Sequence, residues 1–366
     1  MRKALIFVGL NNELVGINCE RFFIYFESIK YYKRIDTDIF CVDYFNEVKN
    51  ISKNYSDFFI FCNSDNFEDE MIFEDCFIDR IISINLRDGP SDLGILLQKK
   101  FLPYIKCFWH FYGNFQLDKK RNNSKINQEI IDKESSGIGL FWQYLKEKTK
   151  NIIKIKDREN DIFFSGRLFY GENNKGRYNA VKYLKERKDI KKIINIFIDE
   201  HEKKYNVYDK IKEEFGEFIN GWIEHKKFLE ILSKSKFSLS LFGHWHTYRF
   251  MESSSVGSIP ICENIDVLDY PGIKSGFSYI DIDEYWNDLD SFFDYLLDPN
   301  NEEMFEEIQN NALSSYYDFY YVNNNNVLPV KGFFEFLNRL TRKVPELKSF
   351  FKNKYIFEIE QNKNRN

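Results

Sequence analysis

The sequence predicts an α/β protein of two Rossmann-like, doubly wound domains followed by a C-terminal helix. Short apolar runs closed by polar or turn residues recur along the chain, and segments with helical periodicity separate them. This alternation is typical of parallel sheets, in which a crossover helix joins each strand to the next. The 366 residues suffice for two domains, which we place at 1–155 and 156–325, with the helix and a polar tail at 326–366.

In the first domain, apolar runs of strand length predict four strands. They are Lys3–Gly9, Ile39–Tyr44, Phe58–Asn63 and Arg80–Leu86. Helices are predicted at Glu13–Lys30 and at Leu140–Lys150, and the second leads into a linker around Lys154–Asn160. The aromatic segment Phe101–Phe115 is compatible with a buried strand or a helix, whereas the polar segment Lys119–Lys133 predicts a surface excursion.

The second domain repeats the pattern with four further strands. They are Asp161–Ser165, Ile193–Ile198, Phe237–Phe242 and Phe277–Ile282. Its helices are predicted at Tyr178–Arg187, His225–Ser233 and Asp283–Leu297, and Gly171–Arg177 predicts a loop. The last helix, Phe333–Phe351, is amphipathic and has basic residues nearby, which fits a helix packed across the domains or one lying at a membrane interface.

Composition excludes some classes of function. With 52 basic and 57 acidic residues, the net charge of −5 gives no electrostatic reason to expect nucleic-acid binding. The six cysteines are far apart and form no C-x-x-C pair, as expected of free thiols in a reducing compartment. The first apolar run is too short for a signal peptide, and no run reaches the ~18 apolar residues of a membrane span. We therefore expect a cytoplasmic protein, with peripheral inner-membrane contact as the alternative.

The segment from Phe237 to Asn264 is the most informative part of the sequence. It reads as strand, turn, short helix, glycine and strand, which is how an α/β domain forms the mouth of a ligand crevice. Arg249 and Glu252 are three residues apart and share a helical face. A guanidinium suits phosphate and a carboxylate suits sugar hydroxyls, although an ordinary βαβ unit with an intrahelical ion pair has the same pattern.

This segment resembles the donor-site signature of GT-B glycosyltransferases, and among them the exostosin-like families. Arg249, Glu252, Gly257, Ile259 and Pro260 stand in the order of the family pattern Arg-x-x-Glu-Ala followed by Gly-Cys-Ile-Pro-Val. The chain departs from the pattern in three places. They are Leu241–Phe242, where Pro-Arg is common, Ser258, where Cys is common, and His244, where many members have an acidic residue. The resemblance covers about residues 161–279.

The resemblance implies a nucleotide sugar, linked to UDP or GDP, as the donor. Glu252 would bind its ribose, and Arg249 would reach the diphosphate or orient Glu252. His244 would contact sugar or phosphate, and the loop at Trp222–Ile223 would pack on the nucleobase. Ser253 and its two serine neighbours could donate hydroxyls to phosphate, or they could form a small-residue packing face.

A second element of the resemblance is the strand that ends in Gly166 and Arg167. By resemblance, Gly166 permits close backbone approach and Arg167 neutralises the leaving diphosphate, with Lys175 and Arg177 as second choices. All these cations could also be solvated loop residues.

We expect no metal and no cofactor beyond the co-substrate. The letters Asp-x-Asp occur at Asp281–Asp283, but their place at a late strand end predicts a helix N-cap. His244 and His246 form a His-x-His pair without a third ligand at suitable spacing. In GT-B enzymes, helix N-termini and basic side chains usually stabilise the leaving group instead.

The catalytic base is the least determined residue. An inverting enzyme needs an acidic residue or histidine that reaches the acceptor hydroxyl. Asp88, His110 and Glu13 are the candidates by position, and Asp88 leads because it follows a strand end. A retaining enzyme would not need this base.

The leading hypothesis is a glycosyltransferase that moves a sugar from a nucleotide sugar to a glycan or lipid-linked glycan acceptor. Synthesis of bacterial surface polysaccharide or lipopolysaccharide is the expected setting. The alternatives are a non-catalytic α/β nucleotide-binding protein, a two-domain sugar epimerase, and a viral enzyme that glycosylates DNA.

Overall fold

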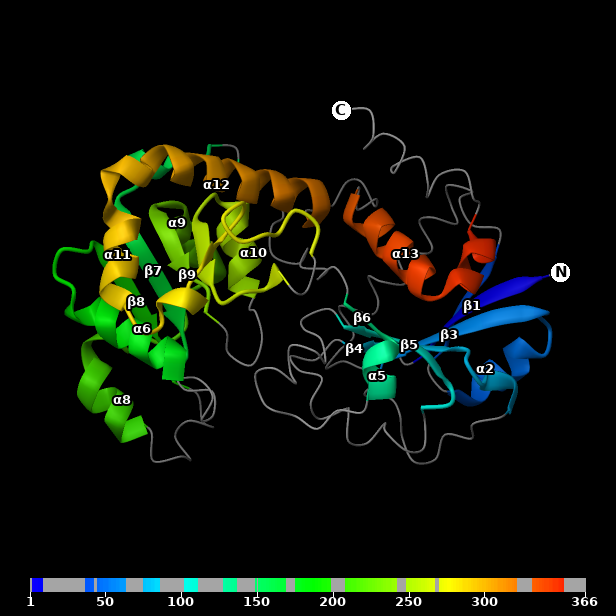
Figure 1. The fold of residues 1–366 in the computed structure, drawn as a ribbon. Coiled ribbons are helices and arrows are strands. Elements are labelled where there is room, and N and C mark those ends of the chain that lie inside the picture. The colour runs from blue at the N-terminus through cyan, green and yellow to red at the C-terminus, as the bar shows by residue number, and fades with distance from the viewer. Residues whose placement is uncertain are drawn as a thin grey trace. The chain divides into compact units, whose positions relative to one another are not determined.

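The computed structural model describes thirteen parts of the chain. They are residues 2–8, 37–42, 45–63, 75–85, 102–110, 128–136, 149, 151–168, 175–198, 208–241, 248–266, 270–320 and 331–351. The chain divides into two compact units, of which the first combines Met1–Leu140 with Val322–Asn366 and the second is Phe141–Tyr321. Each unit contains one parallel sheet with helices, which confirms the predicted fold class (Figure 1).

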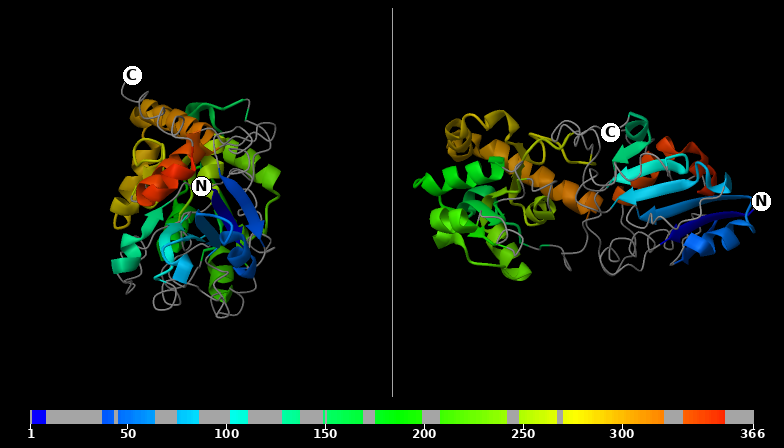
Figure 2. Two further views of the ribbon diagram at one scale, coloured as in Figure 1. Left: turned by 90° about the vertical axis from the view of Figure 1, so that its right-hand side faces the viewer. Right: turned by 90° about the horizontal axis from the view of Figure 1, so that it is seen from below.

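The first sheet has six strands in the order β2-β1-β3-β4-β5-β6, and every pairing is parallel. The strands are β1 Lys3–Val8, β2 Asp38–Val42, β3 Asp57–Asn63, β4 Ile81–Asn85, β5 Ile105–His110 and β6 Glu134–Ser136. Figure 2 shows the strands side by side. The first four strands confirm the predictions, and the aromatic segment contains β5 rather than a helix. Strand β6 and the short helix α5, Gln128–Asp132, were not predicted and lie at the end of the supposed surface excursion.

Both faces of this sheet are covered, which explains why its strands are apolar without alternation. On one face, Ile6 and Ile60 form a cluster with Val48 of helix α2, Phe45–Ser52. On the other face, the ring of Phe59 meets that of Phe350 at 5.4 Å, edge to face. Phe350 lies in the 3₁₀ helix η10, Pro345–Phe350, which follows helix α13, Lys331–Lys343.

The amphipathic C-terminal segment is thus two helices, separated just before Pro345 because proline cannot continue the hydrogen-bonded helix. Leu337 and Leu340 of α13 are buried in the first unit, so these apolar side chains face protein. Within the described ranges, no helix has both the length and the apolarity that crossing a bilayer requires.

The second sheet has five parallel strands in the order β11-β10-β9-β7-β8. The strands are β7 Asn160–Gly166, β8 Lys192–Ile196, β9 Ser235–Leu239, β10 Ile259–Cys262 and β11 Ile280–Asp281. The helices of this unit are α6 Lys175–Glu186, α8 Tyr208–Phe215, α9 His225–Ser233, α10 Tyr248–Ser255, α11 Leu289–Leu297 and α12 Glu302–Ser315. The predicted helix His225–Ser233 matches α9 residue for residue.

Alternate side chains of β7 enter separate clusters. Phe164 packs with Val181 of α6 and Phe292 of α11, whereas Phe163 packs with Phe228 and Leu232 of α9. Helices therefore cover both faces, as doubly wound sheets require.

Three elements predicted for this unit have different boundaries in the structure. Helix α6 begins at Lys175, inside the predicted loop, and the strand predicted at Phe277–Ile282 is only the two residues of β11. Asp288 caps α11 by accepting from Ser291 N at 3.1 Å, so this helix begins later than Asp283. Helices α8 and α12 were not predicted. The segments predicted as helices at Glu13–Lys30 and Leu140–Lys150 lie outside the described residues, except for Thr149.

Arg158 is buried just before β7 and fastens several elements together. Its guanidinium donates to the carbonyls of Ile153, Leu232, Ser235 and Val256, at distances from 2.8 to 3.4 Å. Leu232 and Val256 lie at the C-terminal ends of α9 and α10, where exposed carbonyls carry partial negative charge. Burial lowers the pKa of Arg158 to about 10. Among the described residues, carbonyl dipoles rather than a carboxylate offset the charge.

Other side chains complete the C-terminal cap of α10. Tyr317 donates to the carbonyl of Ser255 at 2.9 Å, and Gln309 donates to that of Gly257 at 2.8 Å. Gly257 has φ +75°, and a Cβ there would lie 2.9 Å from Nη2 of Arg158. Only glycine satisfies both the backbone angle and this close approach.

Arg158→Met should destabilise the second unit by about 3 kcal/mol, because four buried carbonyls lose a charged donor. Chemical unfolding followed by tryptophan fluorescence measures this change. The control is Lys226→Met, which removes an exposed charge from α9 and should change stability by less than about 0.5 kcal/mol. Equal stability of the two variants would contradict the anchoring role.

Candidate functional site

The strand order of the second unit creates a switch point between β7 and β9. These strands are neighbours, but the chain leaves β7 through α6 toward β8 and leaves β9 through α10 toward β10, on the opposite side. In open α/β sheets, ligands bind outside the carboxyl ends of the strands at such a point. Helices α6 and α10 both begin at this edge, so their N-terminal dipoles favour an anion there.

Two helical faces meet beside this edge. On α9, His225 and Phe228 are three residues apart, and on α10, Arg249 and Glu252 have the same spacing. His225 Nε2 lies 3.0 Å from Glu252 Oε1, and Arg249 Cζ lies 4.8 Å from the centroid of the Phe228 ring. Each of the two α9 residues therefore contacts one of the two α10 residues. We call these four residues the α9–α10 cluster.

The Arg249 guanidinium is held against aromatic rings. It lies over Phe228, which packs on Phe163 at 5.3 Å, and 5.9 Å from the Phe197 ring. Burial lowers the pKa of Arg249, while the charge of Glu252 acts in the opposite direction. Within the described part of the chain, this guanidinium forms no hydrogen bond or ion pair. Its planar fork of N–H donors therefore has no acceptor among the described residues, and such a fork suits an anion.

An aromatic platform adjoins the cluster. Trp222 is 79% exposed and stacks on Phe197, with ring centroids 4.3 Å apart and planes at 23°. The loop that carries Trp222 is held by Asn195, which donates to the carbonyl of Gly221 at 3.1 Å and to Ser165 Oγ at 3.2 Å. A large aromatic ring exposed and held from below can stack on a planar ligand.

The arginines near the end of β7 have different environments. Arg177 is buried in the first turn of α6 and donates to the carbonyls of Arg167 and Leu241, which follow β7 and β9. It therefore fastens the two strands at the switch point. Arg167 is half-buried and directly follows Gly166, where an added Cβ would lie 3.3 Å from the Phe164 ring.

The serines of α10 are fully buried. Ser253 donates to the carbonyl of Arg249 at 2.5 Å and lies 3.3 Å from Ser240 Oγ, while Ser254 donates to the carbonyl of Phe250. Their hydroxyls are thus used inside the unit, which favours the packing role over phosphate binding.

Several residues predicted for the site cannot be placed. His244, His246, Glu13 and Asp88 lie outside the described residues. Only the backbone is described for two others. His110 is the last residue of β5, paired with Asn85 and Ser136, and Lys175 is the first residue of α6.

The Asp-x-Asp letters form a local turn. Asp281 Oδ1 accepts from the backbone N–H of Asp283 at 2.8 Å, and its Oδ2 accepts from Asn264 Nδ2 at 2.7 Å. Burial raises the pKa of Asp281. In the described ranges, no group of three or more His, Cys, Asp or Glu side chains is arranged to hold a metal ion.

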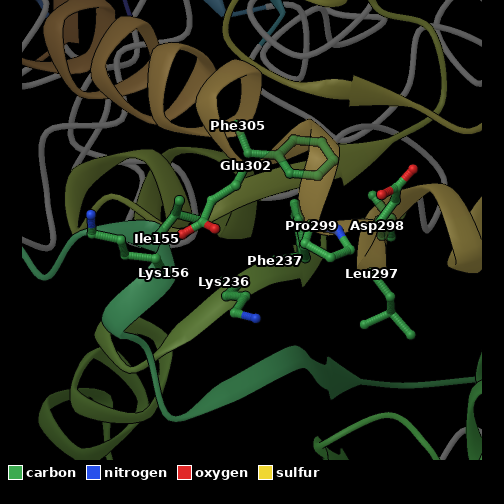
Figure 3. Close-up of a pocket in the computed structure, with 10 residues that line it drawn as sticks. Ile155, Lys156, Lys236, Phe237, Leu297, Asp298, Pro299, Glu302 and Phe305 are labelled. Carbon is green, nitrogen blue, oxygen red and sulfur yellow. The ribbon is translucent and has the colours of Figure 1, made fainter.

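A cavity of about 140 Å³ lies at the opposite, amino end of the sheet (Figure 3). It is lined by Phe237 and Phe305 and by charged residues that include Lys236 and Asp298. Lys236 is paired with Asp161 at 2.9 Å, and Asp298 accepts from the backbone N–H of Asn300. Lys236 and Asp298 thus have local partners, and the cavity lies at the other end of the sheet from the switch point.

Sequence reasoning missed His225, Phe228 and Asn195. The first two could have been found from their spacing on the predicted helix, although not their partners on α10. Asn195 gave no signal, because a polar residue in a strand becomes informative only when its neighbours are known.

Some solved structures of sugar-transferring enzymes are similar in shape to this chain over most of its length. A glycosyltransferase from Rickettsia africae is similar over 95% of this chain and 98% of its own, with 11% identity and a TM-score of 0.47. Sucrose-phosphate synthase from Thermosynechococcus elongatus is similar over 86% of this chain and 94% of its own, with 9% identity and a TM-score of 0.48. Anabaena HepE, solved with UDP and glucose, is similar over 87% and 95%, with 10% identity and a TM-score of 0.42.

No family model matches the sequence, and no curated protein is significantly similar to it. At the identities and TM-scores of the solved structures, the function of this chain has to be argued from its own site.

Arg177→Lys should reduce the stability of the second unit by about 2 kcal/mol, because an ammonium cannot donate to the carbonyls of both Arg167 and Leu241 in the same fork. Arg167→Lys, at a half-buried position, should cost less than about 0.5 kcal/mol. Thermal and chemical unfolding compare the two variants, and equal losses would contradict this division of roles.

Proposed function

We propose that this chain is a glycosyltransferase of GT-B type, similar to the exostosin-like families, that takes its sugar from a UDP- or GDP-linked donor. The observation that carries the proposal is the α9–α10 cluster at the switch point of the second sheet. It combines a buried arginine that forms no hydrogen bond or ion pair within the described residues and a carboxylate three residues further along the same helix. The sequence resemblance at Arg249, Glu252 and Gly257 supports the same assignment.

Each part of a nucleotide diphosphate has a complementary group. Trp222 offers a flat surface for the base, Glu252 accepts from the ribose hydroxyls, and Arg249 donates to the diphosphate. Arg167 and the first turns of α6 and α10 add positive charge at the same edge. Lys175 and His244 are proposed as further donor ligands, and Gly166 as the point of close backbone approach.

Transfer of the sugar breaks its bond to the diphosphate, so charge grows on the leaving oxygen. Fixed cations and helix N-termini stabilise that charge in the transition state more than in the ground state. We propose that they do so here without a metal ion.

The base that takes the proton from an acceptor hydroxyl is proposed among Glu13, Asp88 and His110. The first sheet has its own switch point between β1 and β3, since the chain passes from β1 to β2 on one side and then from β2 to β3 on the other side of β1. Glu13 follows β1 in sequence, so the topology favours Glu13 over Asp88, which follows β4.

The acceptor class is proposed as a glycan or lipid-linked glycan, in bacterial surface polysaccharide or lipopolysaccharide synthesis. Contact with the inner membrane gains no support from α13, because Leu337 and Leu340 are buried in the first unit. A cytoplasmic location is the matching proposal, since nucleotide sugars are made there.

Arg249→Met and Glu252→Ala should each weaken UDP or GDP binding about tenfold or more, because each removes a charged hydrogen-bond partner of the ligand. Calorimetric titration measures the affinities, and Lys226→Met is the control. Unchanged affinity in both variants at native stability would refute the donor site.

Release of UDP or GDP from a panel of nucleotide sugars, with and without glycan acceptors, tests the reaction itself. Release that depends on acceptor supports transfer. Conversion of the sugar without acceptor indicates an epimerase, and tight binding without conversion indicates a non-catalytic protein.

Transfer should proceed in excess EDTA at a rate within about twofold of that in magnesium, because the proposed charge stabilisation is supplied by the protein. Activity that disappears in EDTA and returns with Mg²⁺ or Mn²⁺ would contradict metal independence.

A further inference from the structure

We propose that His225 is a positioning residue that fixes Glu252 for the ribose hydroxyls and so makes this site selective for ribonucleotides over deoxyribonucleotides. The inference rests on the proposed function, since it assumes a nucleotide donor at the α9–α10 cluster. His225 is no part of the sequence resemblance; its contact with Glu252 is seen only in the fold.

The contact is well defined on both sides. His225 Nε2 lies 3.0 Å from Glu252 Oε1, and the Glu252 side chain is 13% exposed. The His225 ring lies nearly parallel to that of Phe228, at 17° with centroids 6.3 Å apart. Phe228 is in turn buried against Phe163. The histidine is therefore supported by its own helix while it reaches across to α10.

The direction of this hydrogen bond follows from the chemistry of its partners. An ionised carboxylate only accepts, so His225 must donate from Nε2. This uses one direction of Oε1 and leaves Oε2 to accept from a ligand. A ribose presents two neighbouring hydroxyl donors, whereas a 2′-deoxyribose presents one.

Without His225, Glu252 would have three rotatable side-chain bonds and a cation, Arg249, on the same helical face. The carboxylate could then turn toward Arg249, because the two residues are three apart on α10. Such an ion pair would occupy both the ribose acceptor and the diphosphate donor. By holding Glu252 away from Arg249, His225 leaves the carboxylate for the ribose and the guanidinium for the diphosphate.

The experiment compares UDP with 2′-deoxy-UDP, and GDP with 2′-deoxy-GDP, by calorimetric titration. Three variants are used. His225→Leu removes the donor and keeps an apolar contact with Phe228, His225→Gln restores an N–H donor, and Lys226→Met changes an exposed neighbour on α9. Thermal unfolding of each variant verifies that it is folded.

The native protein should prefer the ribonucleotide about tenfold, since a hydrogen bond to a charged group has this effect on affinity. His225→Leu should reduce the preference to about twofold, mainly through weaker binding of the ribonucleotide. His225→Gln should recover most of it, and Lys226→Met should keep it. A merely structural histidine would lower both affinities equally and leave their ratio unchanged.

Two outcomes overturn the inference in distinguishable ways. If the native protein prefers the ribonucleotide and His225→Leu keeps that preference, Glu252 is positioned without His225 and the proposed function stands. If the native protein binds neither UDP nor GDP, both the proposed donor site and the role of His225 fail.

Discussion

The buried guanidinium of Arg158 is the interaction on which the second unit depends. It joins the segment before β7 to the C-terminal ends of α9 and α10, and it does so through carbonyls instead of a carboxylate. The last carbonyls of a helix have no hydrogen-bond donor within the helix, and a buried cation needs hydrogen-bond acceptors. Arg158 and these carbonyls therefore satisfy one another. Because α9 and α10 carry the candidate ligand groups nearer their first turns, fixing their last turns orients the whole α9–α10 cluster. Gly257 is part of this device, since a side chain there would displace the arginine.

Within the described residues, the arginines of the second unit have two kinds of environment: some donate to backbone carbonyls, whereas Arg249 has no hydrogen-bond acceptor. Arg158 and Arg177 use their donors on backbone carbonyls, and both are nearly inaccessible. Arg249 is buried against aromatic rings. The faces of these rings attract its positive charge, but they offer its N–H groups no oxygen acceptor. A guanidinium in that environment gains more from an arriving anion than one in water does, since the local dielectric is low. This difference is the physical basis for proposing Arg249 as the diphosphate ligand.

The environment of the Glu252 carboxylate also depends on which neighbouring groups it contacts. Glu252 has a histidine donor on one oxygen and a neighbouring arginine on its own helix. The α9–α10 packing decides which of them it uses. Asn195 has a comparable role on the other side of the cluster, since its amide holds the loop of Trp222 against β7 and β8. A rigid sheet and two helix ends thus position groups that lie on otherwise irregular segments.

The sequence by itself determined the alternation of strands and helices, most strand positions, the helix His225–Ser233 and the shared face of Arg249 and Glu252. These features depend on local periodicity, which a single segment expresses without knowledge of its neighbours. The tertiary structure decided the strand order that puts the switch point between β7 and β9, the inward use of Arg177 and Ser253, and the pairing of His225 with Glu252. Those features depend on which segments become neighbours. That choice is made by burial of apolar surface over the whole unit, and no local pattern records it.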